Sequence, residues 1–140
     1  MTRELEKENV SYVHIEKLGG RRKLSDIGRS RYDDDNNNSG WKNEGFRAYA
    51  DYMSTTSFRD GICEILSVMT NYSNLAIMCA EAVPWHCHRR LIADYLIMVE
   101  GLSVFNIIYS KQKSEFHRLT SFARLTDDRT TIIYPETLER

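Results

Sequence analysis

Leu75 to Val99 reads L-A-I-M-C-A-E-A-V-P-W-H-C-H-R-R-L-I-A-D-Y-L-I-M-V, and this stretch decides the predicted fold. It begins with the apolar run Leu75–Met78 and ends with a second apolar run, Leu91–Val99. The first run has the length of a buried strand, and the second has the spacing of a helix. Residues 79–90, between them, hold two thiols, one carboxylate, two imidazoles and two guanidiniums. Reactive residues at a strand-to-helix junction are typical of sites at the carboxyl ends of parallel strands.

The segments around this stretch complete an α/β pattern. Leu102–Tyr109 predicts another buried strand, and a helix from Pro84 to Glu100 connects it to the strand Leu75–Cys79. A crossover of about 15 residues favours a parallel pair. Further strands are expected at Val10–Ile15 and Thr131–Tyr134, and further helices at Phe46–Met53, Thr56–Met69 and Phe116–Arg124. The predicted fold class is α/β, with a small, mostly parallel sheet flanked by helices in a Rossmann-like three-layer arrangement.

Length and composition favour one globular domain over residues 1–140, with 41% hydrophobic residues. The polar segment 23–44 predicts a flexible loop within that domain. A formal net charge of −1 provides no overall field toward nucleic acid or an anionic membrane. No apolar stretch reaches the roughly 18 residues that a membrane span needs. Three cysteines and a charged start indicate reduced thiols in a soluble, cytoplasmic protein.

The first interpretation of the central motif is thiol chemistry. A cysteine that ends a strand opposite a helix amino terminus meets unpaired N–H groups and the positive end of the helix dipole, which favour a thiolate. Cys79 has this predicted position, so it is the candidate nucleophile or redox thiol. His88 and Glu81 are the candidates for proton transfer, with His86 as an alternative base. The competing interpretation is that Cys79 is a small core residue, as most reduced cysteines are.

A metal site is the second interpretation of the same residues. Cys79, Glu81, Cys87 and His88 are ligand types that suit zinc or iron. Their spacing is poor for this purpose because no C-x-x-C is present, and adjacent helical residues point about 100° apart. No cofactor is therefore predicted, with zinc or iron as the lesser alternative.

An anion site is the third interpretation. Arginine binds phosphate in a bidentate manner, and helix amino termini bind it through their N–H groups. The candidate substrate-binding residues are Arg21, Arg22, Arg47, Tyr49, Asp51, Cys87, Arg89 and Arg90. Arg47 and Asp51 are spaced to lie one above the other on a helix. The competing interpretation is solvated surface charge, and Arg90 has Asp94 four residues later for an ordinary surface pair. His117 is interpreted as a structural or exposed residue.

Several motifs together resemble the domain of unknown function 488 family. They are L-G-G-R-R at 18–22, F-R-A-Y-A-D-Y-M at 46–53, M-C-A-E-A-V-P-W-H-C-H-R-R-L-I-A-D-Y-L at 78–96, H-R-L-T-S-F-A at 117–123 and I-Y-P at 133–135. The resemblance implies a compact α/β fold with the long motif at the mouth of a parallel sheet, and it implies no settled activity. The positions that look like the family signature are Gly19, Gly20, Arg21, Arg47, Tyr49, Asp51, Cys79, Glu81, Cys87, His88, Arg89 and Arg90.

One departure from the family pattern concerns the amino-terminal side. Family members carry a T-I-G-H-S-like strand end and a D-V-R-like second strand ahead of the segment at Tyr12, and neither string occurs here. The chain is therefore expected to leave a sheet edge exposed and to form a homo-oligomer through it, or to cover it with residues 1–9.

Two hypotheses about function follow from the sequence. The first is an enzyme that acts on an anionic substrate, phosphorylated or nucleotide-like, with a cysteine–histidine–arginine site at the strand-to-helix junction. The alternative is a non-enzymatic module that binds a ligand or nucleic acid, in which the thiols only pack. A small anionic ligand is the expected partner in both cases, and no membrane is expected.

Overall fold

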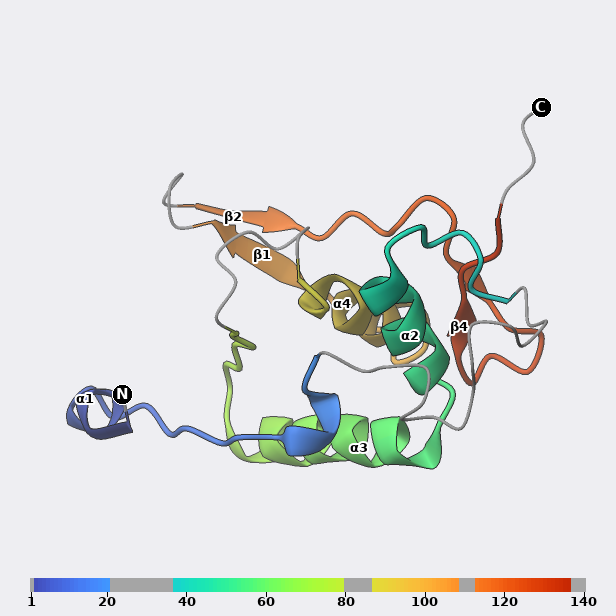
Figure 1. Cartoon of the computed structure of the whole chain (residues 1–140). Helices are drawn as coiled ribbons and strands as arrows, with labels where there is room; N and C mark the ends of the chain where they lie inside the picture. Colours follow the sequence, from blue (N-terminus) through green and yellow to red (C-terminus); the bar gives the residue numbers. More distant parts are fainter. Residues whose placement is uncertain (1, 21–36, 80–86, 109–112, 137–140) are drawn as a thin grey trace.

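A computed structural model describes residues 2–20, 37–79, 87–108 and 113–136 (Figure 1). The helices in these ranges are α1 (Thr2–Lys7), the 3₁₀ turn η1 (Glu16–Leu18), α2 (Glu44–Tyr52), α3 (Thr56–Asn71) and α4 (Arg89–Met98). The strands are β1 (Phe105–Ile108), β2 (Lys113–Phe116), β3 (Arg124–Leu125) and β4 (Ile132–Ile133). None of the helices in this part of the chain has both the length and the apolar character needed to cross a bilayer.

Side-chain caps define where two of the helices begin. The carboxamide of Asn43 accepts a hydrogen bond from the backbone N–H of Phe46 at 3.0 Å, at the start of α2. The hydroxyl of Thr55 accepts one from the N–H of Phe58 at 3.2 Å, at the start of α3. Each cap satisfies one of the N–H groups that the first turn of a helix leaves without a partner. The predicted helices Phe46–Met53 and Thr56–Met69 are therefore confirmed, with starts fixed by residues just ahead of them.

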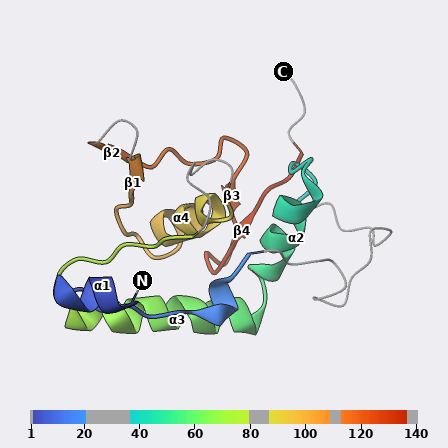
Figure 2. The same cartoon turned by 60° about the vertical axis from the view of Figure 1, so that its left-hand side comes forward.

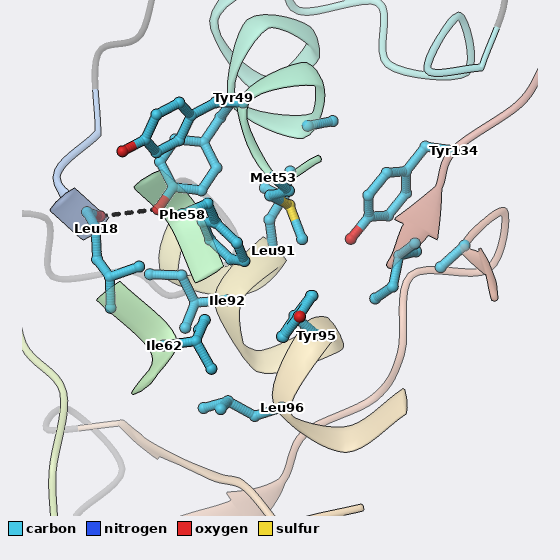
Figure 3. Close-up of a cluster of buried hydrophobic side chains, with 14 of the residues drawn as sticks. Leu18, Tyr49, Met53, Phe58, Ile62, Leu91, Ile92, Tyr95, Leu96 and Tyr134 are labelled. Atoms are coloured by element: carbon cyan, nitrogen blue, oxygen red, sulfur yellow. Dashed lines mark hydrogen bonds between the residues drawn. The ribbon is translucent and has the colours of Figure 1, made fainter. Parts of the chain in front are cut away.

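The core lies where α2, α3 and α4 meet (Figure 3). The apolar stripe of α3 is buried at Phe58, Ile62 and Ile65, as the helical spacing predicts. Helix α4 is buried over the whole run Leu91–Leu96, which includes a carboxylate. Such complete burial needs neighbours on every side, and these come from α2, α3 and the carboxyl-terminal segment (Figures 1 and 3).

Close packing of η1 against α3 depends on Gly61. A Cβ on Gly61 would lie 2.7 Å from the Cδ2 atom of Leu18, so only glycine leaves room for that side chain. The hydroxyl of Tyr49 on α2 donates to the carbonyl of Leu18 at 2.8 Å, and that of Tyr52 donates to Lys17 at 2.7 Å. Helices α2 and α3 thus fix the segment that leads into the glycine pair.

The predicted Rossmann-like parallel sheet is wrong. The described residues hold two small antiparallel sheets, β1 with β2 and β3 with β4. In the first, Phe105 is opposite Phe116 and Ile108 is opposite Lys113. The predicted strands Val10–Ile15 and Leu75–Cys79 have no regular secondary structure and belong to no sheet, and Leu75 and Met78 are exposed.

The physical reason lies in what each segment can pair with. The strand expected at Leu102–Tyr109 exists over Phe105–Ile108, but it pairs with the next segment of the chain. Pairing two neighbouring segments closes a much shorter loop than a parallel crossover, so it costs less chain entropy. Alternation of apolar residues predicts that a segment is extended, and it does not determine its partner or direction.

Two other predicted elements differ from the structure. No helix forms over Phe116–Arg124, because Phe116 ends β2 and Arg124 begins β3. Between them, His117 and Thr120 are held by hydrogen bonds to Asp94, and these tertiary contacts override the helical pattern. The helix expected from Pro84 begins at Arg89, and Pro84 itself lies outside the described residues. The strand expected at Thr131–Tyr134 is confirmed over Ile132–Ile133.

Candidate functional site

Two thiols lie in contact at the start of α4. The Sγ atom of Cys79 is 2.8 Å from the Sγ atom of Cys87, and either sulfur can donate the hydrogen. Cys79 is half-buried in the irregular segment that follows α3, whereas Cys87 is buried next to the first turn of α4. The structure thus brings together two cysteines that the sequence separates by seven residues.

Cys87 is surrounded by nitrogen donors. The backbone N–H of Arg89 and its side-chain Nε each donate to the Cys87 sulfur at 3.4 Å. The Nδ1 atom of His88 lies 3.5 Å from the same sulfur, and its role as donor or acceptor depends on the tautomer. A negative charge that develops on this sulfur would therefore meet a guanidinium and a backbone dipole.

His88 is held in place by residues distant in the sequence. Its ring lies against that of Tyr49 with centroids 5.0 Å apart. On another side, a Cβ on Gly20 would lie 2.6 Å from His88 Nδ1, so this approach is possible only for glycine. Since Tyr49 also bonds the carbonyl of Leu18, α2 holds the glycine pair against the imidazole. Tyr49 is fully buried, and these contacts make it a residue that positions His88 and Gly20.

The other predicted substrate-binding residues in the described ranges lie in different surroundings. Arg90 donates from Nε to the Thr120 hydroxyl at 3.0 Å, and its guanidinium carbon lies 5.0 Å from the centroid of the Trp41 ring. Asp51 accepts a hydrogen bond of 2.6 Å from the carboxamide of Asn38. Arg47 is half-buried on α2. Arg89 and Arg90 therefore diverge, as consecutive helical residues do.

Several predicted residues lie outside the described ranges, namely Arg21, Arg22, Glu81 and His86. The predicted loop 23–44 is also described only from residue 37 onward, where 37–40 form a turn. Among the residues that the structure does describe, no three His, Cys, Asp or Glu side chains are arranged to hold a metal ion. The described site therefore consists of Cys79, Cys87, His88 and Arg89, with Gly20 and Tyr49 behind the imidazole.

A buried polar cluster around Asp94 was missed by the sequence interpretation. Asp94 is fully buried, so the predicted surface pair with Arg90 is wrong. Its Oδ1 atom lies 2.8 Å from His117 Nε2 and accepts from the Thr120 N–H at 3.3 Å, while Oδ2 accepts from the Tyr134 hydroxyl at 2.9 Å. One signal in the sequence points to this cluster: a lone carboxylate within the apolar run Leu91–Val99 must be paired if the run is buried.

This cluster fastens the carboxyl-terminal segment to α4. His117 is buried, and its second ring nitrogen lies 3.1 Å from the carboxamide nitrogen of Asn106. Burial, and next the negative charge of Asp94, raise the pKa of Tyr134 well above its ordinary value of 10.0. Tyr134 therefore stays protonated and donates to the carboxylate across the whole neutral range. The contacts of the cluster are internal ones, which indicates a structural role.

The fold and the site together define a small helical domain with two short antiparallel sheets and a cluster of thiols, imidazole and guanidinium. A family model described as Domain of unknown function DUF488 matches residues 1–96 of the 140, and the chain belongs to that family. The resemblance found in the sequence is thereby confirmed, although the matched region ends before the motifs at 117–123 and 133–135. No curated protein and no solved structure matches the chain.

Proposed function

We propose that the chain is a thiol-dependent enzyme that acts on a small anionic substrate, phosphorylated or nucleotide-like. The observation that carries this proposal is the continuous set of contacts from Cys79 through Cys87 to His88 and Arg89. A nucleophile, a proton carrier and a cation are the groups that nucleophilic attack on an anionic substrate requires. Packing alone requires neither an imidazole nor a guanidinium at a sulfur atom.

The contacts support a role for each side chain. Cys79 is the more exposed thiol and is the nucleophile, and its proton passes to the Cys87 sulfur 2.8 Å away as Cys87 gives up its own proton. His88 Nδ1, 3.5 Å beyond, carries that proton onward to the leaving group. Arg89 lies beside the thiols through its Nε contact and attracts the negative charge of the substrate.

The remaining predicted residues extend this site as further parts of the proposal. Arg21 and Arg22 directly follow Gly20, whose backbone lies against His88. Because they adjoin a residue that lies against His88, both arginines are proposed as further cations that bind the substrate. Glu81 follows Cys79 by two residues and is proposed as a second proton carrier, and Arg47 as a further cation.

The test compares two alkylating reagents of similar shape, iodoacetate and neutral iodoacetamide. An anion-attracting site increases the rate of the charged reagent, so the iodoacetate-to-iodoacetamide rate ratio at Cys79 should exceed that at Cys63 by about tenfold. Cys63 is an exposed thiol on α3 and is an internal control in the same molecule. Peptide mass mapping measures both sites, and Arg89→Ala should reduce the ratio at Cys79 to that at Cys63.

Equal ratios at the two cysteines in the wild-type chain would contradict the proposal. The alternative, a non-enzymatic module that binds a ligand or nucleic acid, predicts a different pattern. Calorimetric titration would then show phosphate or an oligonucleotide binding through the arginines, with both thiols in the motif as slow to react as buried ones.

A further inference from the structure

We infer that Cys79 and Cys87 form a redox pair, which cycles between a dithiol and a disulfide by exchange with a small-molecule disulfide. The two sulfur atoms are 2.8 Å apart, and a disulfide bond is about 2.05 Å long. Formation of the bond therefore requires the sulfurs to approach each other by less than about 1 Å. This inference uses the same thiols as the proposed function, but it requires neither an anionic substrate nor a cation to hold one.

The different surroundings of the two thiols assign them different steps. Cys79 is half-buried and is the thiol that an incoming disulfide meets first. Cys87 is buried, and Arg89 holds its sulfur through two N–H contacts of 3.4 Å. An accessible attacking thiol backed by a buried second thiol suits a reaction in which the second resolves a mixed disulfide. The third cysteine, Cys63, lies on α3 and is not part of the pair.

The exchange balances in atoms and electrons. Cys79 loses its proton and attacks one sulfur of R–S–S–R, so that a mixed disulfide forms and R–S⁻ leaves and takes up a proton. Cys87 then loses its proton to His88 Nδ1, 3.5 Å away, and attacks the Cys79 sulfur. The second R–S⁻ leaves and is protonated in turn. The pair has lost two electrons and two protons, and the co-substrate has become two R–SH molecules.

Arg89 acts as a positioning residue in this cycle. During reduction of the protein disulfide, the thiolate that leaves is Cys87, and the guanidinium and N–H of Arg89 stabilise its charge. Replacement by lysine keeps the charge but loses the fixed geometry of Nε. Arg89→Lys should therefore shift the dithiol–disulfide equilibrium toward the disulfide without preventing its formation.

The experiment titrates the full-length chain with defined ratios of reduced and oxidised glutathione under anaerobic conditions, and then traps the remaining thiols. A matched sample in urea gives the equilibrium for the same cysteines without the fold. Because the native structure holds the sulfurs together, half-oxidation in the folded chain should occur at a glutathione disulfide level at least about tenfold lower than in urea. The product should be one intramolecular link between Cys79 and Cys87, identified by peptide mapping.

Three cysteine variants show which thiols form the link and in which order they react. Cys63→Ser should leave the titration unchanged, because Cys63 lies outside the pair. Cys79→Ser should react slowly at Cys87, and Cys87→Ser should stop at a glutathione adduct on Cys79. Circular dichroism verifies that each variant folds, and the wild-type titration remains decisive if Cys87→Ser does not. Equal midpoints in buffer and in urea, or a link that involves Cys63, would overturn the inference.

The two tests fail independently. A pair that stays reduced while Cys79 still prefers iodoacetate would refute the redox inference and leave the proposed function standing. A disulfide that forms readily in a chain without reagent preference at Cys79 would do the opposite.

Discussion

Two apolar runs, one on either side of the central motif, differ in their burial. Leu91–Leu96 is buried at every position within α4, including the carboxylate of Asp94. Leu75–Met78 is just as apolar, yet Leu75 is 38% and Met78 is 55% exposed. In this run Ile77 packs against the core, and the backbone forms neither a helix nor a strand. The exposed run is wholly apolar and the buried run contains Asp94, so composition alone does not decide burial.

The difference lies in the neighbours that each run meets. Leu91 and Ile92 pack against Met53, directly after α2, and Phe58 on α3, which are themselves fully buried (Figure 3). The segment around Leu75 leaves the end of α3 and crosses the view of Figure 2 between α3 and α4. A helix satisfies its own backbone and needs only side-chain neighbours, whereas a strand needs a partner strand as well.

The largest expected effect is in stability, and two methionines measure it directly. Met53 is fully buried where α2 meets the core, and Met78 is exposed in the run Leu75–Met78. Met53→Ala removes a buried side chain and leaves a cavity, which should lower the free energy of unfolding by about 2–5 kcal/mol. Met78→Ala should change it by less than about 0.5 kcal/mol. Urea denaturation followed by circular dichroism measures both.

The same substitution in both places makes the chemistry of the change identical. Equal losses of stability in Met53→Ala and Met78→Ala would mean that the Met78 side chain is covered in solution. Such a result would remove the contrast between the two runs altogether.

The next effect concerns the hydroxyl of Tyr134, which donates to the buried Asp94. Tyr134→Phe leaves that carboxylate short of one donor, and the free energy of unfolding should fall by about 1–3 kcal/mol. The matched control is Tyr72→Phe, because the Tyr72 hydroxyl makes a 3.0 Å hydrogen bond to Ser11 at an exposed position. Its loss should cost less than about 0.5 kcal/mol. Thermal and urea unfolding of both variants would show whether burial sets the cost.

The same tyrosine predicts a pH dependence. Burial and Asp94 raise the pKa of Tyr134 in the folded chain, whereas the unfolded chain has the ordinary value of 10.0. Below pH 10 Tyr134 is protonated in both the folded and the unfolded state, so the difference in pKa does not affect the free energy of unfolding. Above it the unfolded state releases its proton first, so the free energy of unfolding should fall as the pH rises. Tyr134→Phe should flatten this fall, although burial also raises the pKa of Tyr95, which continues to contribute. An unchanged slope in the variant would contradict the assignment.

The sequence predicts the helices much better than the sheets. The stripe from Phe58 to Met69 determines the buried face of α3 because residues three and four apart share one side of a helix. The strands predicted at Val10–Ile15 and Leu75–Cys79 do not form, because strand pairing depends on segments elsewhere in the chain. Local information therefore determines a helix face and leaves strand partners open.

The candidate site also has features that the sequence predicts and features that depend on distant residues. The density of reactive residues in 79–90 marks the place, and the structure brings Cys79, Cys87, His88 and Arg89 together there. The divergence of Arg90 follows from helical geometry, but its stacking on Trp41 does not, because Trp41 comes from a turn ahead of α2. The partners of Asp94 lie 23 to 40 residues away, and no local spacing encodes them.

The smallest expected effect is association of the exposed runs with a second copy of the chain. The predicted sheet edge is absent at Val10–Ile15, yet Val13 is 55% exposed and matches Met78 as uncovered apolar surface. Exposed apolar surface favours self-association, so the wild-type chain should show a mass that rises with concentration in sedimentation equilibrium. A charge in the contact must be desolvated, so Met78→Asp should raise the dimer dissociation constant about tenfold, or about 1.4 kcal/mol. Ser73→Asp adds the same charge at a nearby exposed polar position and should change the constant much less. A wild-type chain that is monomeric at every concentration would show that the exposed run does not drive association. The difference between Leu75–Met78 and Leu91–Leu96 would then be supported only by the stability measurements on Met53→Ala and Met78→Ala.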